Sequence, residues 1–335
     1  MKKSQLSKAL IATVLLTLAS VCWGTTNSLT FKGNATVASV TILGATTTVN
    51  STGALPSSGG ARCVELVTLN LPGIVSGGVA HASTIGAGNH TDSSASVAGL
   101  SVGVGGLVLT ADLIQSQAYA AVTNGAPTTS GGSSLVNLTI AGQTISINGF
   151  RNQVVVVPGG KIVINETIQS AGSIKVNALH VSLEGLVDVV LGSSYAAVGP
   201  CTGCTNTCTG TANCTDNSDF IIASGSLKDS LSRDAHFGLS IGLLKGKNWG
   251  DFAFEDSHSG INLESTSITQ YQRLSATERV ITGTALLNGF TNVTFALHLV
   301  QNDLGTGTFN LTLSNGYSLS GAIDVGFVHI LQACN

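Results

Sequence analysis

Runs of β-branched and aliphatic residues, separated by turn sequences, constrain the fold of this chain more than any other feature. They recur about every ten residues through the middle of the chain, at 134–140, 144–147, 152–157, 161–168, 173–183 and 186–195. Asn148-Gly149 and Pro158-Gly159 mark turns between them. β-Branched side chains favour the pleated backbone, and this spacing is typical of sandwiches and barrels. Residues 115–122 fit either a helix, through their alanines, or an alternating strand.

The second half of the chain alternates more regularly. Apolar side chains occupy every second position from Val293 to Leu299, and Phe252 and Phe254 lie between the acidic Asp251 and Glu255. Alternation of this kind indicates strands with one buried face. Asn-Gly pairs at 288–289 and 315–316 predict tight hairpins. We therefore expect a second antiparallel sandwich, of about seven or eight strands, with an aromatic core.

Composition divides the chain near residue 200. Residues 25–200 contain 11 charged and four aromatic side chains, whereas residues 201–335 contain 17 and 11. The predicted fold class is therefore all-β, with two antiparallel β-sandwich domains of jelly-roll or immunoglobulin-like type. The predicted organisation is a signal peptide at 1–24, an aliphatic sandwich at 25–198, a Cys-rich linker at 199–218 and an aromatic-cored sandwich at 219–335.

An export signal is predicted at the N-terminus. Lys2, Lys3 and Lys8 precede an apolar run at 9–19, which is too short to span a bilayer as a helix, and cleavage is expected after Gly24. Cys22 leaves lipidation open as an alternative, although the preceding alanine and valine fit a lipidation signal poorly. No other run reaches the length of a membrane span, so we expect an extracellular or cell-surface protein.

The charge of the exported chain argues against two classes of partner. Removing the three lysines of the signal leaves 11 basic and 17 acidic side chains, a formal charge of −6. A mildly acidic chain without a basic stripe is a poor partner for nucleic acid or for anionic membranes.

Six cysteines remain after cleavage, an even number that predicts three disulfides in an exported protein. They are Cys63, Cys201, Cys204, Cys208, Cys214 and Cys334. The alternative is a zinc knot formed by the four central cysteines. Structural zinc sites usually place two C-x2-C pairs on either side of a longer loop, and this cluster has only one such pair.

Several segments carry a family resemblance. In the first half they are 95–100 (ASVAGL), 107–112 (LVLTAD), 132–138 (GSSLVNL), 164–166 (INE) and 176–181 (VNALHV). In the second half they are 254–260 (FEDSHSG), 265–269 (STSIT), 283–285 (GTA) and 313–321 (LSNGYSLSG). The first half resembles the choice-of-anchor P module of bacterial surface proteins, and the second is similar to the small β domain that often follows such modules. The resemblance implies a secreted or surface-displayed protein without assigned catalysis. The chain departs from the family in having no LPxTG-like sorting motif.

Candidate catalytic and metal sites are few. Ser101 and Ser240 each occupy the centre of a G-x-S-x-G match, but neither match is followed by the helical pattern that a nucleophile elbow needs. His258 lies close to Glu255 and Asp256 in sequence, and residues 216–219 could offer oxygen ligands to calcium. A turn stabilised by Asx side chains explains both segments equally well. We therefore predict no enzyme, no cofactor and no metal.

Three residues are candidates for ligand contact. Trp249 and Tyr271 could stack on a sugar ring, and His258 could contact a ligand, although aromatic residues of a sandwich more often form its core. His180 is predicted to be a satisfied, half-buried histidine on the same face as Val176 and Ala178. Eight N-x-S/T triplets occur, at Asn34, Asn50, Asn89, Asn137, Asn165, Asn213, Asn292 and Asn310.

The predicted function is that of a non-enzymatic secreted or cell-surface structural or adhesive protein. It would associate with itself through exposed strand edges, which favour strand addition, or with surface glycans or proteins. Residues 28–42 have the β-propensity of a strand that could add to another copy. The alternative is a monomeric extracellular glycan- or ligand-binding module.

Overall fold

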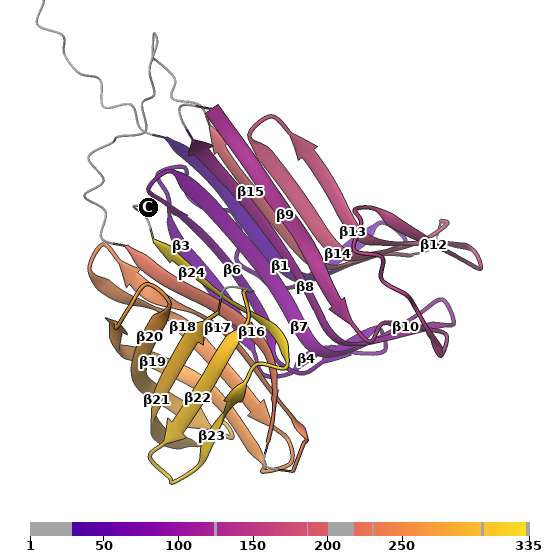
Figure 1. Cartoon of the computed structure of the whole chain (residues 1–335). Coiled ribbons are helices and arrows are strands. Elements are labelled where there is room, and N and C mark those ends of the chain that lie inside the picture. The colour runs from indigo at the N-terminus through magenta and orange to yellow at the C-terminus, as the bar shows by residue number, and fades with distance from the viewer. Residues whose placement is uncertain are drawn as a thin grey trace, which may run out of the picture.

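The computed structural model describes residues 29–123, 126–185, 187–199, 218–229, 231–302 and 305–332. Within these ranges every regular element is a β-strand, so the prediction of an all-β chain is confirmed (Figure 1). A membrane-spanning helix is likewise absent from these ranges. The predicted signal peptide, Cys22 and most of the predicted Cys-rich linker lie outside them.

Sheet A has six antiparallel strands in the order β12-β13-β14-β15-β1-β2. They are β1 (Thr30–Ile42), β2 (Ala45–Ser51), β12 (Gln153–Val157), β13 (Gly160–Ser170), β14 (Ser173–Leu183) and β15 (Val187–Gly199). The N-terminal segment, whose β-propensity would suit addition to another copy, forms β1 in this chain. It lies between β15 and β2 of its own sheet, with Thr30 opposite Gly199 and Ile42 opposite Val187.

Sheet B has nine strands. Its main path is β11-β10-β8-β7-β5-β4, with β9 paired to β8, β6 to β7 and β3 to β6. The strands are β3 (Gly60–Leu66), β4 (Leu69–Leu71), β5 (Val75–Gly77), β6 (Ala80–Ala87), β7 (His90–Val104), β8 (Leu107–Thr123), β9 (Ala126–Val136), β10 (Thr139–Ile140) and β11 (Gln143–Thr144). Residues 115–122 belong to β8, so the strand alternative applies there and the helix alternative does not.

Sheets A and B pack face to face around an aliphatic core. The cluster of buried residues between them contains only Ala, Val, Leu and Ile, as the composition of this half predicted. Buried hydroxyl groups are paired within this layer. Ser116 of β8 and Ser194 of β15 form a hydrogen bond of 2.6 Å, and Thr91 donates to the carbonyl of Ala197 at 3.0 Å. Burial of these polar groups is therefore compensated by bonds between the two sheets.

A row of left-handed residues crosses sheet A. Asn50 in β2, Gly192 in β15 and Asn165 in β13 have φ angles of 53°, 57° and 52°. The strand registers place Val37 of β1 between the first two, and Ala178 of β14 between the last two. Asparagine and glycine are the residues that adopt this conformation at least cost, which explains why they occupy every second strand of the row.

The row reverses the face to which side chains point. In β14 the successive residues Ala178 and Leu179 both belong to the aliphatic core, which regular alternation forbids. His180 consequently lies on the outer face, while Val176 is buried between the sheets. Our placement of His180 on the face of Val176 and Ala178 is therefore wrong, because it assumed unbroken alternation through this row.

Sheet C contains nine strands in the order β23-β22-β21-β20-β19-β18-β17-β16-β24. They are β16 (Asp219–Lys228), β17 (Asp234–Leu244), β18 (Lys247–Asp256), β19 (Ile261–Arg273), β20 (Glu278–Leu287), β21 (Thr291–Gln301), β22 (Gly307–Leu313), β23 (Ser318–Ala322) and β24 (Val325–Gln332). We expected two packed sheets here, whereas the strands form one continuous sheet. Register shifts in β19, at 265–267 and 268–270, bend it, and the curled sheet brings β24 close to β21 (Figure 1).

The inner surface of sheet C carries the predicted aromatic core. Phe252 and Phe254 are fully buried there, and Phe309 lies with its ring centroid 5.9 Å from that of Phe254 and 4.5 Å from that of Phe237. Phe295 completes the group, with its ring 5.3 Å from that of Phe252. The alternation read from the sequence at 252–254 and 293–299 is therefore confirmed.

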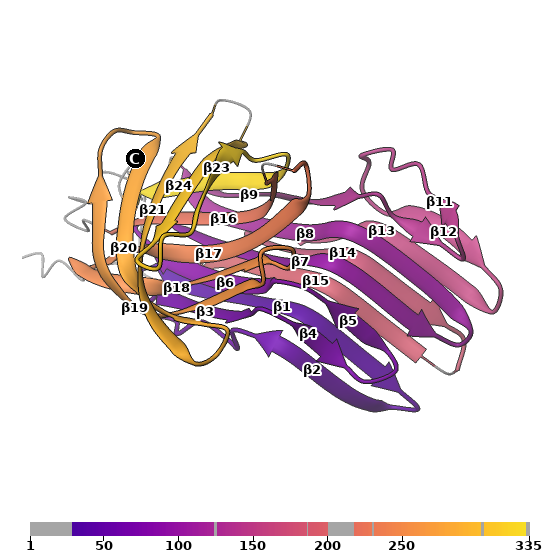
Figure 2. The same ribbon diagram turned by 90° about the horizontal axis from the view of Figure 1, so that it is seen from below.

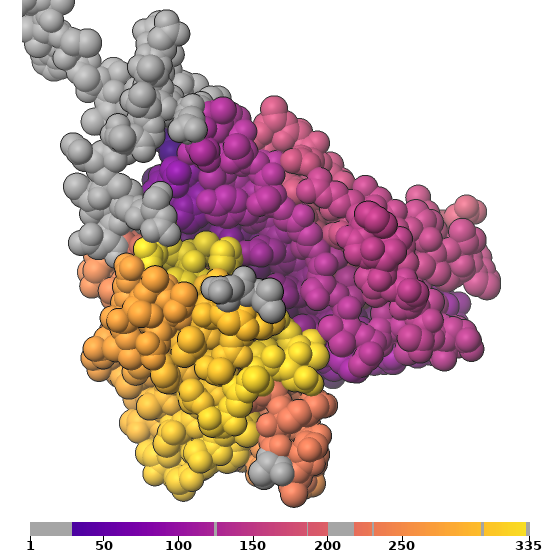
Figure 3. Space-filling view, viewed as in Figure 1, coloured from indigo at the N-terminus to yellow at the C-terminus, as the bar shows by residue number. Residues whose placement is uncertain are grey.

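Sheet B lies between the other two sheets: one of its faces packs against sheet A, and the opposite face packs against sheet C (Figure 2). Strands β3 and β6 contact β17 and β18, and a small apolar cluster joins Ile85 of β6 to Phe220, Ile222 and Leu331 of sheet C. Figure 3 shows the C-terminal strands pressed directly against the N-terminal half. The contact leaves part of the sheet B face uncovered, and this open part forms the candidate site.

Candidate functional site

The face of sheet B that turns towards sheet C is unusually polar for a packed surface. Its side chains form rows across β3, β6, β7 and β8, which read Glu65-His81-Ser96-Gln115, Cys63-Ser83-Ser94-Gln117 and Ala61-Ile85-Asp92-Tyr119. Sheet C covers the β3 and β6 ends of these rows. The β8 ends are open, because sheet C stops at β24.

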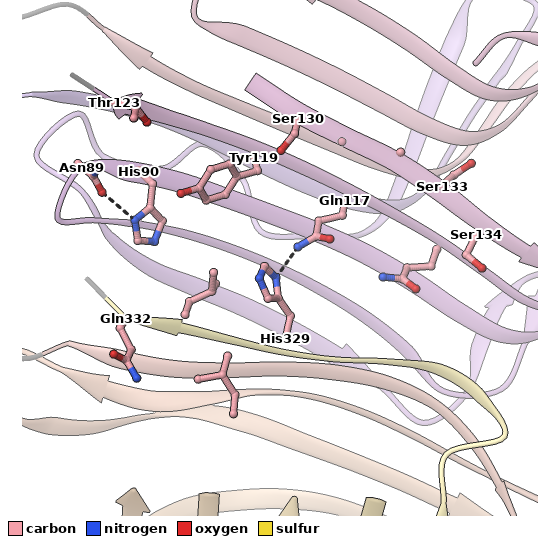
Figure 4. A pocket seen from close by; sticks show the side chains of 15 residues that line it. Asn89, His90, Gln117, Tyr119, Thr123, Ser130, Ser133, Ser134, His329 and Gln332 are labelled. Carbon is pink, nitrogen blue, oxygen red and sulfur yellow. Dashed lines mark hydrogen bonds between the residues drawn. The ribbon is translucent and has the colours of Figure 1, made fainter. Parts of the chain in front are cut away.

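The open end of these rows is a groove of about 760 Å³ between β8, β9 and β24 (Figure 4). Apart from the glycines and the aliphatic Ile330 and Leu331, its lining side chains carry amide, hydroxyl and imidazole groups and one phenol, and none of the described lining residues is Lys, Arg, Asp or Glu. The lining residues are Asn89, His90, Gln115, Gln117, Tyr119, Thr123, Ser130, Gly131, Gly132, Ser133, Ser134, His329, Ile330, Leu331 and Gln332.

A hydrogen-bonded chain joins the floor of the groove to its wall. Nε2 of Gln117 lies 3.1 Å from Oδ2 of Asp92 and 2.7 Å from Nδ1 of His329. Asp92 is fully buried beneath the groove, and this burial raises the pKa of its carboxyl, although His329 and Gln117 act in the opposite direction. Gln117 comes from β8 and His329 from β24, so both halves of the chain build this chain of contacts.

An aromatic pair forms the other end of the groove. The rings of His90 and Tyr119 are stacked, with their centroids 5.5 Å apart and an angle of 26° between their planes. Burial, with the nearby Asp92 carboxyl, raises the pKa of Tyr119, so its phenol stays protonated at neutral pH. The groove thus combines a flat ring with side chains that both donate and accept hydrogen bonds.

The covered end of the polar face holds a serine, a histidine and a glutamate in close proximity. Nε2 of His81 lies 2.9 Å from Oγ of Ser240 and 3.9 Å from Oε1 of Glu65, while Nδ1 of His81 has no partner. A catalytic triad needs the acid on the nitrogen opposite the serine, whereas here both groups approach the same nitrogen. All three side chains are buried between sheets B and C, so no substrate could reach Ser240.

The titratable groups at this covered end are held in their uncharged forms. Burial, with further contributions from Asp251 and Glu264, raises the pKa of Glu65 well above its ordinary value. Burial also lowers the pKa of His81 to about 3. The Cys63 thiol likewise has a raised pKa, through burial and the charge of Asp251, and donates to Asp251 Oδ2 at 3.1 Å. Cys63, Glu65 and His81 therefore form an uncharged polar seam between the halves.

Neither G-x-S-x-G match forms a nucleophile elbow. Ser240 is a fully buried residue of β17, and Ser101 lies in β7, paired with Thr110 on one side and Ser76 on the other. Both serines occupy strand interiors, whereas the elbow requires a sharp turn between a strand and a helix. Composition alone explains both matches in a chain this rich in Gly and Ser.

Tyr271, a candidate for sugar stacking, lies in the interior of the protein. Its side chain is 7% exposed, and its hydroxyl donates to the Asp219 carboxylate and accepts from Nε of Arg279 at 2.9 Å. Trp249 is half-buried and meets the ring of Phe220 edge-on, with 5.9 Å between centroids. Tyr271 therefore cannot stack on a ligand, and a ligand contact by Trp249 stays a prediction.

The acidic turn around His258 is stabilised by local hydrogen bonds. Oδ1 of Asp256 accepts from the backbone amides of His258 and Ser259, and its Oδ2 accepts from the Tyr317 hydroxyl at 2.9 Å. His258 itself is exposed. Among the residues that the structure describes, no three His, Cys, Asp or Glu side chains are arranged to hold a metal ion. The Asx-turn explanation of this segment fits the observed geometry.

Of the six cysteines predicted to form disulfides, only Cys63 lies in the described ranges, and there its thiol is free. Cys201, Cys204, Cys208, Cys214 and Cys334 lie outside the described residues. The disulfide and zinc alternatives for the central cluster therefore stay predictions.

His180 is satisfied and half-buried, as predicted. Its Nδ1 lies 2.9 Å from Glu166 Oε2 and its Nε2 lies 2.9 Å from Asp188 Oδ2. Both carboxylates raise the pKa of His180, which outweighs the opposing effect of its burial. The three side chains form an ion-paired patch on the outer face of sheet A, remote from the groove.

The residues of the groove were not among the sequence-based candidates. Their local signal is weak: every residue of 90–96 except Ala95 is polar, as are all three residues of 115–117, and nothing in these runs separates a binding surface from an ordinary polar strand. The decisive contact joins Gln117 to His329, which lie in different halves of the chain. A pattern read along the chain cannot reveal such a pair.

Comparisons with known proteins give no family. No protein-family model matches the chain, and no curated protein matches it. Among solved structures, it is similar to a predicted AttH of Nitrosomonas europaea, with 8% identity, 91% of this chain and 93% of that chain covered, and a TM-score of 0.20. Kievitone hydratase of Nectria haematococca has 11% identity, coverages of 82% and 90%, and a TM-score of 0.18. Scores this low carry no argument about the fold or function of this chain.

Proposed function

We propose that the protein is an exported, non-enzymatic binding protein that holds an uncharged, hydroxyl-rich ligand, such as a glycan chain, in the groove between sheets B and C. The observation that carries the proposal is the composition of the groove wall. The groove of about 760 Å³ is lined mainly by amide, hydroxyl and aromatic groups, with the aliphatic Ile330 and Leu331, and its described lining contains no Lys, Arg, Asp or Glu. The groove favours the binding-module alternative over the structural role that we ranked first from the sequence.

The chemistry of the lining matches that of a sugar. Each sugar hydroxyl both donates and accepts hydrogen bonds, as do the side chains of Asn89, Gln115 and Gln117. The ring of Tyr119 offers an apolar surface beside them, which suits the less polar face of a pyranose ring. Ligand pockets commonly combine such a surface with a few convergent polar groups. An anionic ligand would find no lysine or arginine in this lining.

The test is a glycan array followed by calorimetry on the purified protein. Tyr119→Ala should abolish binding to whichever neutral glycan the wild type retains. Phe290→Ala is the matched control, because Phe290 is an aromatic residue that is 92% exposed on the β20–β21 turn, outside the groove lining. Equal binding by both variants, or retention of acidic glycans alone, would show that the proposal is wrong.

Self-association is a second candidate function, favoured by the two open edges of sheet A. Strand β2 exposes Thr46, Thr47 and Thr48, and β12 exposes Val154 and Val156 by 55% and 83%. Neither strand contains a charged residue, and charges are the usual protection of an edge against strand addition. Val156→Lys should therefore reduce any multimers seen by size-exclusion chromatography and electron microscopy. Multimers unchanged by the substitution would exclude the β12 edge.

Further proposals extend this function to the whole chain. We propose that the halves are two β domains joined by a Cys-rich linker, as in the choice-of-anchor modules that the chain resembles, and that the linker contains disulfides. Mass spectrometry of the exported protein, with thiol labelling before and after reduction, tests the disulfides and the cleavage after Gly24. Labelling of every cysteine without reduction would contradict them.

A further inference from the structure

The side chain of Gln117 determines the polarity of the hydrogen bonds at the centre of the groove. Its amide nitrogen lies within hydrogen-bond distance of both Asp92 Oδ2 and His329 Nδ1 (Figure 4). An amide nitrogen has two N–H donors and no acceptor. His329 Nδ1 must therefore accept, and its proton must reside on Nε2. The opposite amide orientation would place the Gln117 oxygen against Oδ2 of Asp92, and that contact would be a hydrogen bond only if this carboxyl oxygen carried a proton.

We propose that Asp92 and Gln117 hold His329 as the Nε2–H tautomer, so that the groove presents an acceptor, Gln117 Oε1, and, on the opposite side of the imidazole ring, a donor, the His329 Nε2–H, to hydroxyl groups of an uncharged sugar chain. Asp92 is a positioning residue in this arrangement, since it is fully buried and acts through Gln117. The choice of ligand rests on the proposed function, whereas the tautomer is a property of the free protein.

The pairing of one donor with one acceptor selects the class of ligand. One sugar hydroxyl donates to Gln117 Oε1, and a second hydroxyl, farther along the sugar chain, accepts from the His329 Nε2–H. A carboxylate or sulfate has acceptors only, so it would place an oxygen against Gln117 Oε1 with no proton between them. The side chain of His329 is 34% exposed, which leaves its free nitrogen accessible from the groove.

The tautomer can be measured without any ligand. Long-range ¹H–¹⁵N correlation spectra of the full exported protein should show a protonated Nε2 and an unprotonated Nδ1 for His329 at neutral pH, with the signal assigned by its loss in His329→Phe. Gln117→Glu replaces the donor by an acceptor and should move a proton onto Nδ1. Gln115→Glu is the control, because it adds the same charge to the groove without replacing this contact. An Nδ1–H tautomer in the wild type, or no change in Gln117→Glu, would overturn the inference.

The role of Asp92 is tested by two substitutions of different chemistry. Asp92→Asn keeps an acceptor for Gln117 and should preserve the tautomer, whereas Asp92→Leu removes the acceptor and should give a mixture of tautomers. If Asp92→Leu does not fold, Gln117→Met removes the same restraint from a half-buried position. A single Nε2–H tautomer in the variant without the restraint would overturn the positioning role.

The ligand class is tested with maltohexaose, cellohexaose and mannohexaose as neutral probes and a galacturonic acid hexamer as the charged one. Losing one hydrogen bond in Gln117→Met or His329→Phe should weaken binding of the retained neutral probe by about tenfold. The predicted tautomer without binding of any neutral probe would overturn the proposed function. Neutral binding that is unchanged in both variants would overturn the present inference alone.

Discussion

Replacing Arg279 by methionine should destabilise the protein more than almost any other single substitution. The guanidinium is completely buried, and its Nε and Nη2 donate to the two oxygens of Asp219 at 2.7 and 2.8 Å. Nη1 donates to the carbonyls of Ser275 and Glu278 at 2.7 and 2.9 Å, and Nε also lies 2.9 Å from the Tyr271 hydroxyl. Methionine retains the apolar stem of the side chain and removes all of these donors.

The magnitude follows from what the substitution leaves behind. Asp219 is about nine-tenths buried, and without Arg279 its carboxylate loses both of its bidentate bonds. Removing one partner of a buried ion pair typically costs about 3–5 kcal/mol. A domain of this size loses about 2–4 °C of melting temperature per kcal/mol, so we expect a decrease of roughly 6–20 °C.

The assay is urea unfolding followed by tryptophan fluorescence, with calorimetry for the melting temperature. Arg273→Met is the matched control, because Arg273 is 52% exposed with Nη1 4.0 Å from Asp219, and it should cost less than about 1 kcal/mol. Adding Asp219→Leu to Arg279→Met should recover part of the loss, since it removes the unpaired carboxylate. If Arg279→Met cost no more than Arg273→Met, the argument from the buried ion pair would be refuted.

Three further predictions concern the polar seam and the row of left-handed residues. In the folded protein Glu65 retains a proton that the unfolded chain releases above about pH 4.5, because burial raises the pKa of Glu65. Above that pH the free energy of unfolding should therefore fall, relative to that of Glu65→Gln, by about 1.4 kcal/mol per pH unit until Glu65 ionises in the folded protein. Parallel plots of unfolding free energy against pH for the two proteins would contradict this. His81 stays neutral down to about pH 3, so relative to His81→Gln stability should fall as the pH decreases from 6.5 to that value, measured by the same titration. Asn165→Gly should change the free energy of unfolding by less than about 1 kcal/mol, because glycine adopts a φ of 52° freely. Asn165→Val should lower it by about 1–3 kcal/mol, because a β-branched residue is strained at this φ. Equal losses of stability in urea unfolding of the two variants would contradict this reasoning.

The sequence predicts individual strands well wherever one face is buried. The run expected at 173–183 coincides with β14, and the alternation at 293–299 lies within β21. The period-2 pattern is strong here because one set of side chains must reach a core while the other meets water. Local chemistry therefore suffices for the existence and type of these elements.

The arrangement of the strands depends on contacts that no local pattern contains. Residues 28–42 have the β-propensity of a strand that could add to another copy, yet residues 30–42 pair with β15, which is far away in the sequence. The curl of sheet C depends on register shifts in β19, and neither shift has a signature in the composition of 261–273. The groove arises only where β24 stops short of β9, so its residues could not be found before the sheets were placed.

The row of left-handed residues shows how one sequence signal can be read in two ways. Asn50 and Asn165 each belong to an N-x-S/T triplet, a pattern that marks an exposed glycosylation site where a host glycosylates asparagine. In the structure Asn165 is 7% exposed, and Nδ2 of Asn50 donates to the carbonyls of Val64 and Ala80. The Asn50 side chain thus bonds to backbone carbonyls of β3 and β6 in sheet B, and the Asn165 side chain donates to the backbone carbonyl of Phe150.

The central position of β1 determines the order in which the molecule can fold. A chain that emerges from a ribosome or a translocase with its N-terminus first presents β1 long before β15 is available, because Thr30 pairs with Gly199. Folds dominated by such distant pairing form slowly, on a scale of milliseconds to seconds. During that interval one edge of β1 is open to strands of neighbouring chains. The amount of protein that a cell recovers should therefore depend on chaperones that shelter this strand, and only weakly on the stability of the finished fold.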